Sequence, residues 1–265
     1  MHQTKYATDL LTRFDMTNCK PSSTPYFSLS RLNQTQGTPL PNPTHFPSLV
    51  GALQYLTFTR PDLSFVGNQV CQFMHSPIDT HMVATKQILR YLKGTLNHGL
   101  LFHPNSLTFQ AYADANWVGN PKDRRFTSGY VVFLGSTPIT WVSKKQSTVS
   151  HSFTKAEYRS FASTTVEVFW IHMILKDLGI FLPDPPLLWC DNLSALALAS
   201  NPVFHAQTKH IEVDYHFICE KVVRRDIVVK FVSTTDQLAD ILTKCLPSPR
   251  FTRLRDNLLL PFRPP

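Results

Sequence analysis

The chain has 265 residues, of which 43% are hydrophobic, and its formal net charge is +8 with a pI near 9.3. This hydrophobic content supports one large or two ordinary folded domains and excludes wholesale disorder. The five cysteines show no CxxC pairing, which argues against a disulfide framework or a zinc site. The polar start and the absence of a long apolar run argue against a secretory signal or a membrane span.

The cysteines and the charge also indicate an environment and a class of partner. Unpaired cysteines favour an intracellular, reducing compartment, either cytoplasmic or nuclear. The excess of Lys and Arg favours a polyanionic partner, and the absence of a long apolar run is the reason that no membrane partner is expected. Because these basic residues are spread along the chain, a solvated basic surface without a ligand is the alternative.

The first hundred residues predict helices. Residues 3–16 carry one apolar stripe, and residues 18–47 are rich in Pro, Ser, Thr and Asn without a period, which is typical of a linker. Three further helices separated by prolines form a small bundle over roughly 46–98, at 46–58, 62–75 and 79–95.

From residue 99 the pattern changes to strands followed by interleaved helices. Strands are predicted at 99–103, 107–114, 128–135, 138–143, 187–190 and 227–233. Helices are predicted at 154–178, 193–200, 209–225 and 236–243. This order indicates an α/β fold in which helices pack on a mixed sheet. Residues 247–265 are interpreted as a basic, Pro-rich tail.

Four carboxylates occupy settings where a purely structural role is hard to assign. Asp114 closes a strand, Glu157 begins a long helix, Asp191 ends the apolar run LLWCD, and Asp240 lies in a short helix. Oxygen ligands suit hard divalent cations, and two such cations can clamp the attacking and leaving oxygens of a phosphodiester. The sequence therefore indicates a metal-dependent ribonuclease.

Glu157 has a competing structural explanation as the last residue of a capping box that begins at Thr154. The helical stripe through Phe161, Thr164 and Val168 instead places Glu157 at the head of the buried face. A buried carboxylate needs a cation or a hydrogen-bond partner, so the ligand interpretation is favoured.

The other three acids leave their alternatives open. Asp191 could equally cap the helix that starts at Leu193. Asp114 could be an ordinary residue at a strand end, and Asp240 could complement a helix dipole. Taken individually, none of the three decides the function.

The stretches around these acids strongly resemble the RNase H domain of copia-type LTR retrotransposon Pol polyproteins. The matching text is YADANWVG, DRRFTSGYVVFLG, ITWVSKKQSTVSHSFTKAEYRS, LWCDNLSALALASNPVFHAQTKHIEVDYHFICEKV and FVSTTDQLADILTK. Earlier stretches resemble the end of the reverse transcriptase and the segment that joins it to RNase H. The resemblance implies an RNase H-like fold over 99–246, a thumb- or connection-like helical segment over 46–98, a linker over 26–45, and a reverse-transcriptase remnant over 1–25.

The resemblance also implies what the site would do. The family's metal-binding acids fall on Asp114, Glu157, Asp191 and Asp240, with two Mg²⁺ ions as cofactors and Mn²⁺ as a second candidate. The expected reaction is hydrolysis of RNA in an RNA–DNA hybrid, and other nucleic acids are further candidate partners. No Asp-Asp pair of the polymerase motif occurs in the chain, so we expect no DNA synthesis. The missing reverse-transcriptase region, supplied in trans, is another candidate partner.

Hybrid binding should rest on phosphate and 2′-hydroxyl contacts, because cleavage must tolerate any sequence. The candidate residues are Lys144, Lys145, Gln146, Arg124, Arg125 and Asn192, each of which could also be an ordinary surface residue. His210 and His216 are interpreted as structural or surface residues of their helix, and Trp117, Trp141 and Trp189 as core residues.

The chain departs from the family pattern at four positions that are not ligands: Asn116, Phe153, Lys155 and Cys245. Two alternatives to an enzyme therefore stand beside it. One is a catalytically inactive nucleic-acid-binding module, and the other is a non-functional retroelement remnant.

Overall fold

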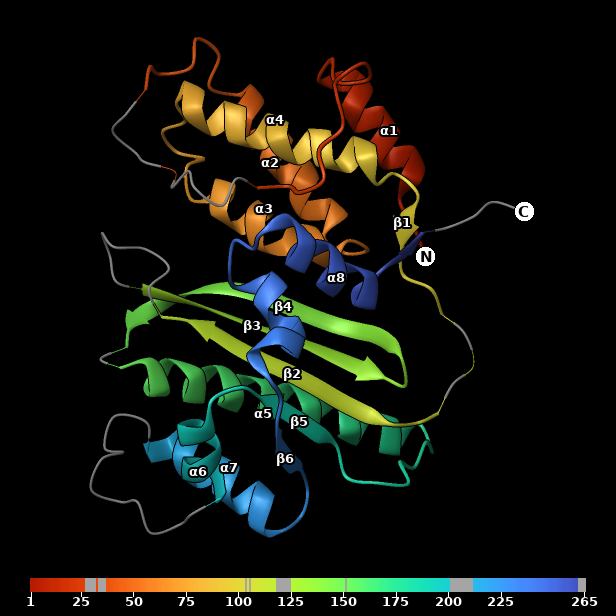
Figure 1. Ribbon diagram of the computed structural model, residues 1–265, viewed down its shortest axis with the longest axis vertical. Helices are drawn as coiled ribbons and strands as arrows, with labels where there is room; N and C mark the ends of the chain where they lie inside the picture. The colour runs from red at the N-terminus through yellow and green to blue at the C-terminus, as the bar shows by residue number, and fades with distance from the viewer. Residues whose placement is uncertain are drawn as a thin grey trace. The chain divides into compact units, whose positions relative to one another are not determined.

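The structure is a computed structural model that describes residues 1–26, 32, 37–102, 104, 106–117, 125–150, 152–200 and 212–261. The chain divides into two compact units (Figure 1). The helical unit comprises Met1–Phe102 together with Cys245–Pro265, and the sheet unit comprises His103–Lys244. No described helix is both long and apolar enough to cross a membrane.

Helices predicted for the first hundred residues are confirmed. They are α1 (Thr4–Arg13), α2 (His45–Leu56), the 3₁₀ turn η1 (Pro61–Leu63), α3 (Ser64–Cys71) and α4 (Asp79–Gly94). Pro61 lies in the first turn of η1, where a missing N–H costs nothing. The core of the helical unit is built from the apolar faces of α1, α2, α3 and α4, which bury Leu10, Leu53 and Leu92 among others.

The C-terminal segment contains an element that the sequence analysis missed. Residues Ser248–Leu258 form helix α8, which buries Phe251, Leu254 and Leu258. After it, the two-residue strand β7 (Leu260–Pro261) pairs with β1 (His98–Gly99). The predicted strand at 99–103 is therefore wrong in extent, because β1 ends at Gly99 and Leu101 and Phe102 are exposed.

The sheet unit is built on five strands: β2 (Phe109–Asn116), β3 (Arg125–Leu134), β4 (Thr137–Val149), β5 (Leu187–Cys190) and β6 (Val228–Phe231). Their order is β4-β3-β2-β5-β6, in which β2, β3 and β4 form an antiparallel meander while β5 and β6 run parallel to β2. This arrangement confirms the predicted α/β fold class, in which helices pack on a mixed sheet.

Helices α5 (Phe153–Asp177) and α6 (Leu193–Ser200) pack on the sheet, and α7 (Glu212–Val223) packs against both of these helices (Figure 1). The core between them includes Phe109, Val132, Phe161, Leu188 and Ile218. The predicted last helix consists of two 3₁₀ turns instead, η3 (Thr234–Asp236) and η4 (Leu238–Leu242). The predicted stripe of α5 is confirmed through Leu175, whereas Leu178 lies beyond the helix and is exposed.

Candidate metal site

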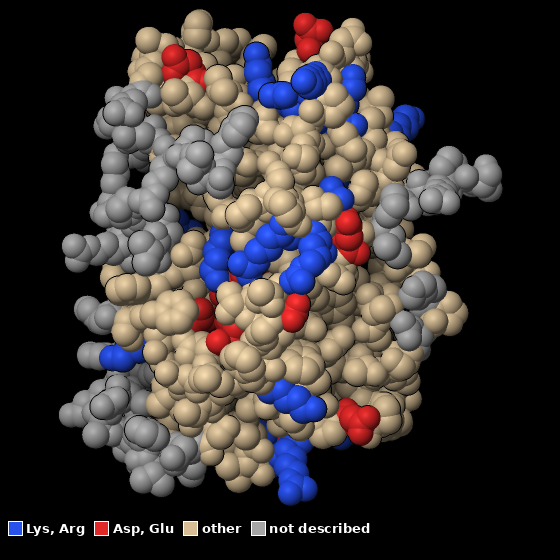
Figure 2. Space-filling view, viewed as in Figure 1, with Lys and Arg blue, Asp and Glu red and all other residues tan. Residues whose placement is uncertain are grey.

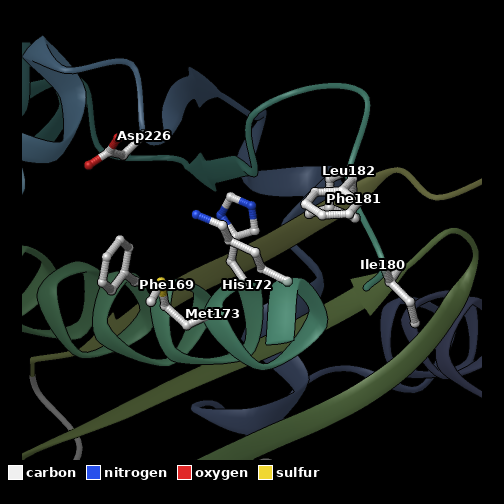
Figure 3. A pocket seen from close by; sticks show the side chains of 8 residues that line it. Phe169, His172, Met173, Ile180, Phe181, Leu182 and Asp226 are labelled. Carbon is white, nitrogen blue, oxygen red and sulfur yellow. The ribbon is translucent and has the colours of Figure 1, made fainter. Parts of the chain in front are cut away.

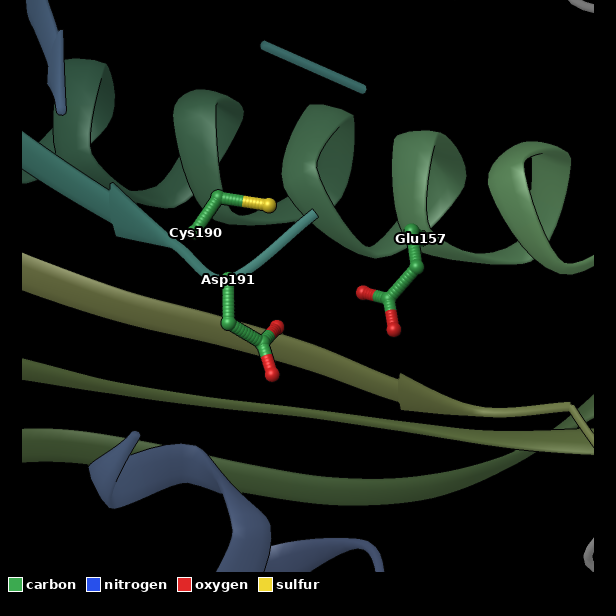
Figure 4. Close-up of side chains that lie close together, drawn as sticks. All are labelled: Glu157, Cys190 and Asp191. Carbon is green, nitrogen blue, oxygen red and sulfur yellow. The ribbon is translucent and has the colours of Figure 1, made fainter. Parts of the chain in front are cut away.

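The four acids singled out from the sequence lie close together in the sheet unit. Asp114, Asp191 and Asp240 each offer one oxygen, and these atoms lie within 4.8 Å of one another. Glu157 and Asp191 form a second such group with the Cys190 thiol. Figure 4 shows the second group, in which Glu157 projects from α5 toward the end of β5. The structure therefore brings all four acids into one cluster.

Strand register explains why two of these acids meet. The parallel pairing of β2 with β5 places Tyr112 beside Trp189. Continued by two residues, the same register brings Asp114 level with Asp191. Carboxyl ends of parallel strands share one edge of a sheet, which is where ligands of α/β folds commonly bind.

Two buried hydrogen bonds fasten the other elements to β2 on either side of Asp114. Ser160 of α5 donates from Oγ to the Asp114 carbonyl oxygen at 2.8 Å. Gln237, which is fully buried, donates from Nε2 to the Ala113 carbonyl oxygen at 2.9 Å and accepts from the Ala239 amide. The helix and the 3₁₀ turn η4 are thus held against the strand by main-chain contacts.

Gly129 of β3 makes the close approach of η4 possible. It pairs with Asp114 across the antiparallel ladder. A Cβ atom at this position would lie 2.8 Å from both Leu242 Cβ and Thr243 Cγ2. Only glycine leaves room for the turn that carries Asp240.

Glu157 is not the capping residue that one interpretation required. The N-cap of α5 is Ser152, whose Oγ accepts from the Lys155 amide at 3.3 Å. Glu157 is instead buried to 1% exposure, and its Oε2 accepts from the Ala115 amide at 3.1 Å. Its Oε1 is buried and has no hydrogen-bond partner among the described residues.

Asp191 does not cap its helix either. The cap of α6 is Asn192, whose Oδ1 accepts from the Ala195 amide at 3.0 Å. Asp191 accepts through Oδ2 from Thr234 Oγ1 at 3.1 Å, while its Oδ1 is buried and has no partner within the part of the chain that the structure describes. The Cys190 thiol is hydrogen-bonded to the neighbouring backbone, since its Sγ accepts from the Asn192 amide at 3.4 Å.

The cluster also contains a cation that the sequence analysis did not single out. Lys244 donates from Nζ to Asp114 Oδ1 at 3.0 Å and to Asp240 Oδ1 at 2.7 Å. Thr243 donates its hydroxyl to Asp114 Oδ2. The four-residue spacing from Asp240 to Lys244 was the available signal, because such pairs face one another on a helical turn.

Electrostatics of the cluster follow from burial and crowding. Burial, together with the neighbouring Asp114 and Asp191 carboxylates, raises the pKa of Glu157 to about 10. Burial disfavours the charged form of Lys244, but Asp114 and Asp240 outweigh it and raise the lysine pKa above its ordinary value. Glu157 therefore holds a proton at neutral pH unless a cation replaces it.

The predicted substrate-binding residues are only partly brought near one another. Lys144, Lys145 and Gln146 lie within β4, not after it as the sequence suggested, because that strand continues to Val149. Lys144 is exposed, while Gln146 donates from Nε2 to Ser128 Oγ at 2.6 Å. Arg125 is exposed at the start of β3, and Arg124 lies outside the described residues.

The aromatic and histidine assignments had mixed outcomes. Trp117 is 38% exposed and donates from Nε1 to the Ser150 carbonyl oxygen, so its assignment to the core is wrong. Trp141 and Trp189 are half-buried, and Trp189 stacks on Tyr112 with ring centroids 6.1 Å apart. His216 is exposed on α7, and His210 lies outside the described residues.

Residues that depart from the family pattern take ordinary structural roles. Asn116 donates from Nδ2 to the Thr243 carbonyl oxygen at 3.2 Å, so it helps to hold the turn after η4. Phe153 is 47% exposed at the start of α5, and Lys155 gives its amide to the Ser152 cap. Cys245 is half-buried and belongs to the helical unit.

A pocket of about 330 Å³ lies elsewhere in the sheet unit, along the C-terminal half of α5 (Figure 3). It is lined by Phe169, His172, Met173, Lys176, Ile180, Phe181, Leu182 and Asp226. None of the four clustered acids lines it, so this pocket is separate from the carboxylate cluster. On the face shown in Figure 2, several basic side chains gather together, and acidic side chains lie directly beside some of them.

Comparison with known proteins identifies relatives over the whole chain. The retrovirus-related Pol polyprotein from transposon RE1 of Arabidopsis thaliana is 47% identical over 266 residues, which cover 100% of this chain and 18% of the polyprotein. That from transposon RE2 of the same plant is 49% identical over 247 residues, which cover 93% of the chain and 17% of the polyprotein. The chain thus spans less than a fifth of these curated relatives.

No family model matches the chain. Among solved structures, LC11-RNase H1 isolated from compost is 15% identical, covers 52% of this chain and 93% of its own, and gives a TM-score of 0.41. This likeness is too distant to add to the topology described above. At 47% and 49% identity over most of the chain, its homologues are retrovirus-related Pol polyproteins from copia-type transposons.

Proposed function

We propose that the sheet unit is a ribonuclease H that hydrolyses the RNA strand of an RNA–DNA hybrid with divalent cations, Mg²⁺ or Mn²⁺. The observation that carries this proposal is a pair of buried carboxylate oxygens, Glu157 Oε1 and Asp191 Oδ1, for which the described part of the chain offers no hydrogen-bond partner. Leaving such oxygens unpaired inside a protein is costly, so a cation from solution is the group that fits them.

The donor set agrees with this fit. Asp114, Glu157, Asp191 and Asp240 supply oxygen ligands, which hard divalent cations prefer. They come from β2, α5, β5 and η4, and the contacts of Ser160 and Gln237 hold those elements in place. Cys190 is a poor candidate ligand for such a cation, because burial raises the pKa of its thiol and keeps it protonated.

Cations bound by these acids would supply activation of a water molecule and stabilisation of the leaving oxygen. The side chains of the site would hold the cations and fix the orientation of the carboxylates. Glu157 would give up its proton when a cation binds, and the Ala115 amide would keep its Oε2 fixed. Thr243 and Lys244 would fix the orientation of Asp114 before a substrate arrives.

Substrate contacts on the protein side should be mainly to the backbone of the hybrid. Lys144 and Arg125 are exposed and suited to phosphate contacts. Asn192 uses its Oδ1 as a helix cap, so its amide nitrogen is the group proposed to reach a 2′-hydroxyl. Such contacts would distinguish RNA from DNA without reading sequence.

The test is cleavage of a labelled RNA–DNA hybrid in Mg²⁺, comparing the wild-type chain with Asp191→Asn. We expect cleavage by the wild type and its loss in the variant and in EDTA. Asp184→Asn, which changes an exposed acid of the same unit, is the matched control and should cleave normally. A folded wild type that binds the hybrid but does not cleave it would overturn the enzyme and leave a binding module.

A further inference from the structure

Lys244 places a positive charge where a cluster of carboxylates would otherwise hold a metal ion. Its Nζ lies 3.0 Å from Asp114 Oδ1 and 2.7 Å from Asp240 Oδ1. Both aspartates are fully buried, and both belong to the group of three whose oxygens lie within 4.8 Å of one another. The ammonium therefore already neutralises one side of the cluster.

Hydrogen bonding divides the cluster into two halves. Both oxygens of Asp114 are engaged, Oδ1 by Lys244 and Oδ2 by Thr243. Glu157 and Asp191 are each held through one oxygen and leave the other buried without a partner. Figure 4 shows these two side chains from α5 and from the end of β5. Only this second half presents orphaned oxygens to a cation.

Lys244 is placed so that it can leave the cluster without unfolding it. It follows Asp240 by four residues at the end of the turn, and its side chain is 27% exposed. A flexible four-carbon stem can carry the ammonium outward to water by rotamer changes alone. Its departure would remove the positive charge that balances the Asp114 and Asp240 carboxylates, which are then costly to keep buried.

We propose that Lys244 occupies the position of one divalent cation in the resting protein. The cluster then binds a single metal ion at Glu157 and Asp191, and a second ion binds only when the ammonium is displaced from Asp114 and Asp240. This inference rests on the proposed metal-dependent function and adds a counter-ion that competes with the metal. A phosphodiester is the kind of anion that would draw the ammonium away as the second ion enters.

The experiment is Mn²⁺ binding to the full chain, measured by the electron paramagnetic resonance of free Mn²⁺. We expect one tightly bound Mn²⁺ in the wild type, which Glu157→Gln removes. Lys244→Met should bind a second Mn²⁺ with an affinity raised by about tenfold or more, because no ammonium opposes it. Lys244→Arg keeps the charge and should bind as the wild type does.

Thermal unfolding shows whether the Lys244→Met variant is folded. Without metal, Lys244→Met should melt at a lower temperature than the wild type, and Mn²⁺ should raise its melting temperature more than that of the wild type. Lys221→Met is the matched control, since Lys221 also pairs with an acid of the same unit, Asp226, away from the cluster. That variant should leave Mn²⁺ stoichiometry unchanged.

The outcomes separate this inference from the proposed function. Two equally tight Mn²⁺ ions in the wild type, or a single ion in a folded Lys244→Met, would overturn the role of Lys244 and leave the metal site intact. A folded wild type that binds no Mn²⁺ at millimolar concentrations would overturn both.

Discussion

Each unit of the chain buries a cluster of charged side chains, and the two clusters differ in how completely their charged groups are hydrogen-bonded. In the helical unit, Arg60 donates from Nε to Asp62 Oδ1 at 2.9 Å and from Nη2 to Asp62 Oδ2 at 2.7 Å. Tyr91 donates to the same carboxylate at 2.5 Å. Thr95 accepts from Arg60 Nη1 through its carbonyl oxygen and from Arg60 Nη2 through its hydroxyl oxygen. In the sheet unit, Lys244 forms ion pairs with Asp114 and Asp240. Glu157 and Asp191 each keep one oxygen that has no hydrogen-bond partner among the described residues.

This difference separates a structural role from a reactive one. Burial alone would raise the pKa of Asp62, but Arg60 outweighs it and holds that pKa below its usual range. Burial and neighbouring carboxylates raise the pKa of Glu157 to about 10. A cluster whose polar groups are all hydrogen-bonded stabilises the fold, whereas one with unpartnered oxygens fits the proposed binding of an ion from solution.

The largest effect is expected from breaking the self-satisfied cluster. Arg60→Met should destabilise the helical unit by about 3–5 kcal/mol, because Asp62 is left as an unpaired buried charge. Hydrogen-exchange protection of the α4 amides would measure the loss. The double variant Arg60→Met with Asp62→Leu should recover most of it. A single variant within about 1 kcal/mol of the wild type would contradict the assigned structural role.

The next effect is a dependence of stability on pH in the absence of metal. The folded pKa of Glu157, about 10, lies above its ordinary value of 4.5. Its contribution is therefore complete below about pH 4.5 and declines as the pH rises toward 10. Asp62, with a lowered pKa, shows the opposite sign, since its contribution is lost only as acid protonates it.

Glu157→Gln should remove the alkaline half of this dependence. At pH 7 in EDTA, the variant should be more stable than the wild type by about 3 kcal/mol, because glutamine carries no charge to lose. Urea unfolding at several pH values would measure it. Glu167→Gln, on the same helix and outside the cluster, is the control and should keep the wild-type pH profile. Parallel profiles for the wild type and Glu157→Gln would show that Glu157 is not the titrating group.

A smaller effect is expected at the point where η4 meets the sheet. Gly129→Ala should destabilise the sheet unit by about 1–3 kcal/mol, because its methyl group would collide with Leu242 and Thr243. It should also weaken Mn²⁺ binding by displacing Asp240. Gly51→Ala, where a Cβ meets nothing within 4 Å, should be neutral or stabilising. If Gly129→Ala bound Mn²⁺ as tightly as the wild type, metal binding would not depend on how closely η4 approaches β3.

The smallest effect concerns the cap beside the acids. Asn192→Ala should cost about 1 kcal/mol of stability, since α6 loses its N-cap, while Asn192→Ser should restore the cap. Comparing the affinity of the two variants for an RNA–DNA hybrid then tests the second role of Asn192. If serine restores stability but not affinity, the amide contacts the substrate. Equal recovery of both would leave Asn192 as a cap alone.

Much of the sheet unit was predictable because its signals are local. Apolar runs mark β2, β5 and β6, and the stripe below Glu157 correctly predicted that its side chain is buried. Helix α8 also carried a usable signal, namely a proline in its first turn and apolar residues at 251, 254 and 258. The helix was missed because residues 247–265 were predicted to be a basic, Pro-rich tail.

The role of Lys244 could not be predicted, because it depends on tertiary packing. Its distance to Asp114 depends on how η4 lies against β2 and β3, which Gly129 and Gln237 decide. The neighbours Asp191 and Asn192 are both good capping residues, and only the backbone geometry shows which one caps α6. Sequence patterns indicate which residues could act as a cap or a ligand, whereas tertiary packing decides which of them does.

The division of the chain gives Lys244 a practical importance. It is the last residue of the sheet unit, and Cys245 already belongs to the helical unit. A recombinant fragment that ends at Thr243 would keep all four acids and still lack the ammonium among them. Such a fragment should need less metal to fill its cluster and should be less stable without it. One residue at the chosen terminus would therefore change the metal requirement that a biochemist reports for the same domain.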